Sequence, residues 1–141
     1  MPGAETLGRC EKLVALLKKQ AEANRPYGAI GAATAHVLQP HGLLMASVRV
    51  GLYCVHSIFS DRSYISEYED FVQLQGNKAT TCSSMTGLLA DASECENRVV
   101  VDGNVVTSRS AGTAMEYAVT VVEKLLGCDV ARRLAEDLLF A

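Results

Sequence analysis

The sequence lacks any surplus of positive charge. Its 13 Lys and Arg residues are outnumbered by 16 Asp and Glu residues, which gives a formal net charge of -3 at neutral pH. A surface that neutralises a phosphate backbone usually carries basic residues interleaved with aromatic residues. This sequence contains no such run. We therefore expect no nucleic acid among the partners of this protein.

A membrane-spanning segment and an export signal are also missing. Residues 42–59 are apolar over a length close to that of a membrane span, but Arg49 lies near the middle of them. An Arg at that depth costs about 2.5 to 3.5 kcal/mol on insertion scales. The first eleven residues contain no basic region followed by an apolar core. These absences predict that the protein has no membrane partner. They also predict a cytoplasmic location by default, with an organelle as the open alternative.

Cysteine pairs with metal-site spacing are absent as well. The five cysteines are widely spaced, and none of them forms a C-x-x-C pair. In a chain without an export signal this pattern favours free thiols in a reducing compartment over a disulfide framework. A zinc site would have to be assembled from scattered residues such as Cys54, His56, Cys82 and Cys95. We interpret Cys10 and Cys128 as helix or cap residues and the other cysteines as small packing groups, and we expect neither a metal nor a cofactor.

The chain does contain helices and strands in alternation. A length of 141 residues with 49% hydrophobic content fits one globular domain. Apolar residues at three- and four-residue spacing predict a helix from Leu7 to Ala21, ending near Asn24. A short buried strand over Tyr27–Ile30 follows, then a short helix over 32–38, and a strand over 78–82. This order predicts an α/β layered fold.

The C-terminal third carries the clearest local patterns. Two β-branched runs, 98–101 and 104–108, flank Asp102-Gly103 and predict a hairpin. Thr113 and Glu116 have capping-box spacing at the start of a helix that ends at Gly127. A last helix over 129–139 is predicted to bury Val130, Leu134 and Leu138.

Chemistry could be located where the strand over residues 27–30 turns into the next helix. Such an elbow presents one side chain above the sheet, and it suits a nucleophile or an anion. Gly31 provides no side chain there, so we favour a structural role. For His36 and His41 we favour a solvent-facing or capping role over that of a base, and Arg109 is either an anion contact or a surface ion pair.

Two blocks, residues 2–44 and 76–141, together resemble the ThiJ/PfpI family of parkinsonism-associated deglycases, most of all its plant members. The pattern TSR-x-x-GT-x-x-E, from Thr107 to Glu116, carries the resemblance. It implies an incomplete flavodoxin-like three-layer sandwich of the class I glutamine amidotransferase type. It also implies a usually homodimeric protein with glutathione-independent glyoxalase or deglycase activity on a small methylglyoxal-type aldehyde.

The resemblance also implies where the family's catalytic groups would lie. The elbow position, occupied in the family by a cysteine, is Gly31, and the family's histidine position is Cys82. The acidic partner belongs to an N-terminal segment that this chain does not contain. Residues 45–75 resemble nothing in the family. We therefore predict one partial domain over residues 1–141, truncated at its N-terminus, with an insertion over 45–75.

These departures lead us to expect a catalytically inactive protein. The alternatives are a non-catalytic module and an enzyme that uses a relocated thiol at Cys82. Such a module would pair with a full-length ThiJ/PfpI-type chain, as a homo- or hetero-oligomer, through a retained helix or an exposed sheet edge. A product of a gene model without selected activity also remains open.

Overall fold

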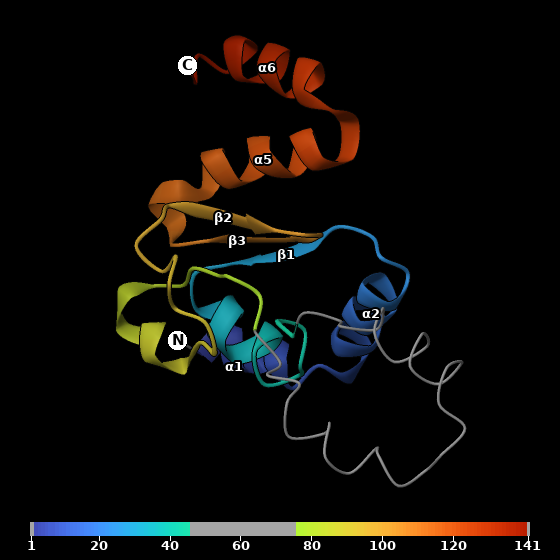
Figure 1. The fold of residues 1–141 in the computed structure, drawn as a ribbon, viewed down its shortest axis with the longest axis vertical. Helices are drawn as coiled ribbons and strands as arrows, with labels where there is room; N and C mark the ends of the chain where they lie inside the picture. Colours follow the sequence, from blue (N-terminus) through green and yellow to red (C-terminus); the bar gives the residue numbers. More distant parts are fainter. Residues whose placement is uncertain (1, 46–75, 141) are drawn as a thin grey trace, which may run out of the picture.

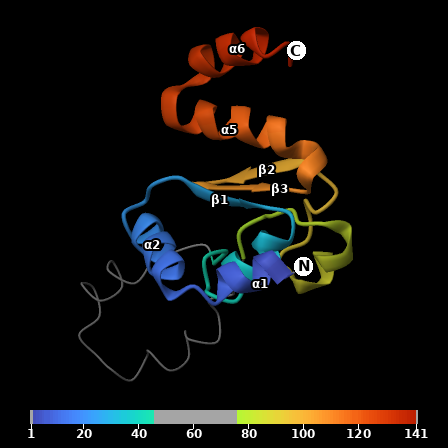
Figure 2. The ribbon, with the colours of Figure 1, turned by 180° about the vertical axis from the view of Figure 1, so that it is seen from behind.

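The computed structural model describes residues 2–45 and 76–140 and has three layers. A small sheet lies in the middle, with α5 and α6 stacked on one of its faces and the N-terminal helices below the other (Figure 1). The view from behind gives the same order of layers (Figure 2). The helices are α1 (Pro2–Gly8), α2 (Glu11–Glu22), η1 (Thr34–Leu38), η3 (Ser83–Leu88), η4 (Ala111–Thr113), α5 (Ala114–Leu126) and α6 (Cys128–Asp137).

The sheet has three strands, β1 (Tyr27–Ile30), β2 (Val99–Asp102) and β3 (Val105–Ser108), in the order β1-β3-β2. β1 runs parallel to β3, and β2 pairs with β3 in the antiparallel sense. The β2–β3 hairpin confirms the prediction made from Asp102-Gly103, and Gly103 has the positive φ of 57° that a tight hairpin turn requires. A parallel pair between helical layers is an α/β arrangement of the flavodoxin-like type, as predicted.

The main core lies between the sheet and the segments around η1. It is formed by Ala29, Leu38, Leu43, Leu44, Ala79, Leu89 and Val105. Leu38 and Leu44 are only 1% and 2% exposed. The predicted helix over 32–38 is therefore confirmed, and it is π-helical over Thr34–Leu38.

The helix predicted from Leu7 to Ala21 is confirmed as α2 (Glu11–Glu22), but its predicted start is wrong, because residues 2–8 form the separate helix α1 and the backbone changes direction at Cys10. Cys10 lies between the two helices with an extended backbone, at φ -80° and ψ 97°. α1 packs so close to η1 that a Cβ atom at Gly8 would lie 2.5 Å from the carbonyl oxygen of His36. His41 Nε2 lies 2.8 Å from the Gly8 carbonyl, so the end of α1 is fixed by a capping histidine.

The predicted strand over 78–82 is also wrong, since no residue of this segment belongs to the sheet. Its polar groups bond instead to side chains and to carbonyls outside the three strands. The N–H of Thr80 donates to the hydroxyl of Thr107, and the hydroxyl of Thr81 donates to the carbonyl of Gly31. The strand prediction could not distinguish a segment that is bonded through hydroxyl groups from a strand that is paired in a ladder.

The predicted burial on the last helix is only partly correct. Ala131 is buried at 3% exposure, whereas Val130 and Leu138 remain 42% and 48% exposed. Leu134 is half-buried. The difference arises because α6 packs on the outer side of α5, away from the sheet, so one face alone is covered (Figure 1).

The predicted insertion over 45–75 lies outside the described residues, apart from Met45. Its two flanks lie beside each other, since Met45 and Gly76 form an isolated antiparallel bridge. The N–H of Asn77 also donates to the carbonyl of Leu44 at 2.6 Å. In the two described stretches, no helix has the length and apolar character needed to cross a membrane.

The core assignment predicts the effect of one truncation. Leu38→Ala removes a side chain that is 1% exposed and should lower the free energy of unfolding by about 2 to 5 kcal/mol in chemical denaturation. Leu16→Ala is the matched control, because Leu16 is 61% exposed on α2 and its truncation should change stability by less than about 0.5 kcal/mol. Equal losses for the two variants would contradict the position of the core.

Candidate functional site

The elbow predicted after the first strand is present at Gly31. Gly31 is buried, and its backbone has a φ of 58°, in the left-handed region that favours glycine. Its N–H donates to the carbonyl of Ser108 at 2.7 Å, and its carbonyl accepts from the N–H of Thr34 at 3.2 Å. The elbow therefore keeps a constrained conformation although no side chain is displayed on it.

The space at the elbow would accommodate a Cβ atom. A Cβ atom at Gly31 would meet only the carbonyl oxygen of Arg109 at 3.7 Å and the Cα of Ser110 at 3.8 Å, which are ordinary contacts. The cost of a residue at this position would come from the left-handed backbone, at roughly 1 to 2 kcal/mol. The elbow therefore lacks a side chain because its residue is glycine, and not because a Cβ atom would clash there.

Cys82 lies close to the elbow in the structure, although the two are far apart in sequence. The hydroxyl of Thr81, the residue before Cys82, donates to the carbonyl of Gly31 at 2.9 Å. Cys82 itself is half-buried at the start of η3, with its Sγ 3.6 Å from the hydroxyl oxygen of Ser84. The two predicted site positions are therefore brought together at the carboxyl ends of the parallel strands, where open α/β sheets bind ligands.

Arg109, the residue after β3, forms an ion pair, which is one of the two roles considered for it. Its guanidinium lies 3.0 Å from a carboxylate oxygen of Glu96 and also donates to the carbonyl of Glu96. A third contact is a hydrogen bond of 3.0 Å to the hydroxyl of Ser83. Sequence reasoning missed Ser83, Thr81 and Glu96, because no local pattern marks residues whose partners lie on distant segments.

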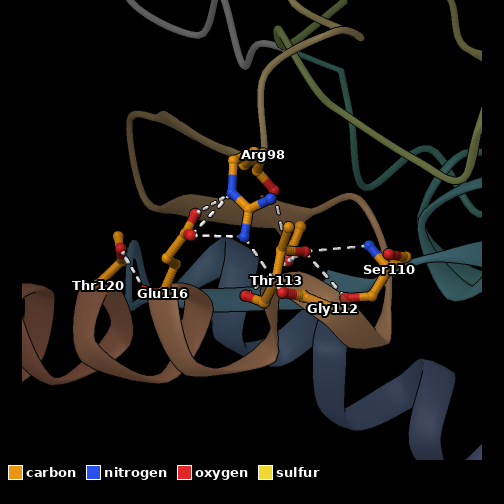
Figure 3. A network of polar contacts seen from close by, with 7 residues as sticks. Arg98, Ser110, Gly112, Thr113, Glu116 and Thr120 are labelled. Atoms are coloured by element: carbon orange, nitrogen blue, oxygen red, sulfur yellow. Dashed lines mark hydrogen bonds and ion pairs between the residues drawn. The ribbon is translucent and has the colours of Figure 1, made fainter. Parts of the chain in front are cut away.

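Glu116 is not the capping residue that the T-x-x-E spacing predicted. Arg98, at the start of the hairpin, donates to both carboxylate oxygens of Glu116 at 2.7 and 2.9 Å and to the carbonyl of Gly112 at 3.2 Å (Figure 3). The cap is formed one turn earlier, where the hydroxyl of Thr113 bonds the backbone of Ser110. The family-like pattern thus encodes a clamp that fastens the start of α5 to the hairpin.

The clamp has an electrostatic signature. Hydrogen bonding to Arg98 lowers the pKa of Glu116, and Glu116 raises the pKa of Arg98. Both groups are exposed to solvent, which weakens the pair.

Other predicted positions do not join the elbow. The hollow beside His41, of about 450 Å³, is lined by α2 and the turn over residues 41–43. A second hollow, of about 480 Å³, lies beside Cys128.

Among the described residues, no group of three or more His, Cys, Asp or Glu side chains could hold a metal ion. Of the four residues considered for zinc, Cys54 and His56 lie outside the described residues.

The clamp predicts a pH-dependent stability. Because the folded state lowers the pKa of Glu116, its contribution is complete above the ordinary carboxyl pKa and is lost as the pH falls through the lowered value. Glu116→Gln should therefore melt below the wild type at neutral pH, with a gap that closes in acid. Glu123→Gln, on an exposed position of the same helix, should show no such closing gap. A gap independent of pH would contradict the role of Glu116.

Comparison with known proteins connects this geometry to relatives. The model of the DJ-1/PfpI family matches residues 71–124. Protein DJ-1 homolog A of Arabidopsis thaliana is 42% identical over 134 residues, which cover 95% of this chain and 26% of that protein. DJ-1 homolog B of the same plant is 40% identical over 95% of this chain and 24% of its own length. The chain therefore spans about a quarter of the length of these curated relatives.

A solved structure agrees with the fold. Oxidized Toxoplasma gondii DJ-1 superposes with a TM-score of 0.74 at 30% identity, and the match covers all of this chain and 60% of that one. Drosophila melanogaster DJ-1beta gives a TM-score of 0.71 at 26% identity over the same shares. The family match over residues 71–124, the two plant relatives and the agreement in fold together show that this chain is similar to members of the DJ-1/PfpI family.

Proposed function

We propose that this chain is a catalytically silent DJ-1/PfpI domain. The single observation that carries the proposal is the elbow, where Gly31 keeps the constrained backbone but offers no nucleophile. Glyoxalase or deglycase chemistry of the kind that the resemblance implies needs a thiolate to add to the aldehyde carbon. A constrained elbow without a side chain supports the interpretation as a pseudoenzyme of the family.

The proposed role is that of an interaction module in a homo- or hetero-oligomer with another DJ-1/PfpI-type chain. The support for this role is the outer edge of β1. The N–H groups of Tyr27 and Gly31 donate to the carbonyls of Asn104 and Ser108, so the alternate residues, Gly28 and Ile30, direct their backbone groups to the opposite edge of β1. In the described part of the chain, β1 is an edge strand of the sheet. Such an edge can add a strand from a partner, here one that would lie parallel to β1 as β3 does.

The second candidate is an enzyme that acts through Cys82. Its support is the position of Cys82 next to Thr81, which bonds the elbow carbonyl. The surroundings of the thiol argue against it: among the described residues its Sγ has a polar contact with the hydroxyl of Ser84 at 3.6 Å, and a hydroxyl is a poor base for thiol activation. We propose a cytoplasmic location for either function, and a small aldehyde as the ligand of the second.

Turnover of methylglyoxal without glutathione tests the proposal. The wild-type chain should consume no aldehyde above background, and Cys82→Ala should behave identically. Gly31→Cys should add a titratable thiol with little turnover, because general acid–base assistance worth about 10² to 10⁴ in rate is still absent. Gly103→Cys is the matched control, since Gly103 has a similar φ of 57° with open space around it. Turnover by the wild type that Cys82→Ala abolishes would establish the second candidate.

Partner binding can be followed without any mutation. On mixing with Arabidopsis DJ-1 homolog A, the amide protons of Gly28 and Ile30 should gain protection from hydrogen exchange, because a new strand would satisfy them. Val99 and Val101 on the outer edge of β2 serve as internal controls and should exchange as before. Protection that appears at β2 instead, or at neither edge, would contradict pairing through β1.

A further inference from the structure

Two half-buried free cysteines, Cys82 and Cys95, lie on segments that run side by side. The first contact between these segments is an ion pair of 3.4 Å between Lys78 and Glu94. The second is a hydrogen bond of 2.9 Å from the hydroxyl of Thr80 to the carbonyl of Cys95 itself. The contacts therefore advance in the same direction along both segments.

Arg109 supplies the next contact in this series. One end of its guanidinium donates to the hydroxyl of Ser83 at 3.0 Å, and the other end donates to the carbonyl of Glu96 at 3.0 Å. Each of these partners is the residue that follows one of the two cysteines. Cys82 is thus enclosed between Thr80, which bonds Cys95, and Ser83, which is joined to Glu96 through one side chain.

We propose that Cys82 and Cys95 are a redox-active pair that forms an intramolecular disulfide on exposure to a peroxide. A disulfide requires the two Cα atoms to come within about 4.4 to 6.8 Å. The contacts on either side of the two cysteines hold their segments together, which favours that approach. Neither cysteine is the elbow residue, so the chemistry of the pair does not depend on the absence of a nucleophile at Gly31.

The reaction balances with a peroxide as the oxidant. One thiolate attacks a peroxide oxygen, the O–O bond breaks, and a sulfenic acid and one water molecule result after proton uptake. The second thiol then attacks the sulfenic sulfur, loses its proton, and releases a second water molecule as the S–S bond forms. Two thiols are oxidised, one hydrogen peroxide is reduced, and a dithiol reductant reverses the change.

The structural consequence concerns η3. Cys82 is the residue at the N-terminal end of η3, and Cys95 lies in the segment leading to β2. The disulfide would tie these segments covalently where Arg109 now joins them by hydrogen bonds. Because Thr81 bonds Gly31, the elbow lies next to the tied segment.

The sequence makes a direct test simple. Trypsin releases both cysteines in one peptide, residues 79–98, with no internal Lys or Arg. After hydrogen peroxide treatment and alkylation of remaining thiols, this peptide should be lighter than the reduced peptide by two hydrogen atoms and carry no alkyl group. A glutamyl endopeptidase should then cut between Glu94 and Cys95, leaving fragments that separate only after reduction.

Variants locate the cross-link. Cys82→Ser and Cys95→Ser should each abolish it, whereas Cys10→Ser and Cys128→Ser, which remove exposed thiols elsewhere, should leave it unchanged. Arg109→Ala should slow its formation, and Arg132→Ala, which removes an exposed Arg beside Cys128, should not. Full alkylation of both thiols in the wild-type peptide after peroxide treatment, or a cross-link from either one to another cysteine, would overturn the proposal.

Discussion

The constraint on which the site depends is the left-handed backbone at Gly31. Three hydrogen bonds hold it from different directions: its N–H bonds to the end of β3, and its carbonyl accepts from Thr34 and Thr81. These partners come from the strand beside it, the helix after it and a segment remote in sequence. The elbow is therefore a property of the surrounding scaffold, and it persists without the side chain that an elbow usually presents.

Buried hydroxyl groups are the means by which the scaffold achieves this. Thr80, Thr81, Thr107 and Ser108 are all fully buried. Thr107 accepts from the N–H of Thr80, and Ser108 lies 2.7 Å from the hydroxyl of Thr113 at the start of the α5 region. Side-chain hydroxyls thus connect the sheet to segments on both of its faces where backbone ladders do not reach. The Arg98–Glu116 clamp adds a further connection at the surface.

The sequence predicts those parts of the fold whose causes are local. The hairpin, the strand before the elbow and the helix ending at Gly127 follow from β-branched runs, Asp-Gly and apolar spacing. The break at Cys10 and the partner of Glu116 depend on contacts with distant residues, His41 and Arg98, and no local pattern contains that information. At the site, Gly31 and Cys82 were identified through the family resemblance. Thr81, Ser83 and Glu96 could be recognised only in the structure, because their partners lie on distant segments.

The central claim is that the backbone of the elbow is held in place by its surroundings although Gly31 presents no side chain. Amide hydrogen exchange of Gly31 measures this most directly, because its N–H is buried and bonded to Ser108 at 2.7 Å. Our account predicts that this amide exchanges as slowly as those of β3, through opening of the whole domain. Exchange at the rate of an unstructured peptide, with β3 still protected, would show that the elbow collapses without a side chain and would contradict the account.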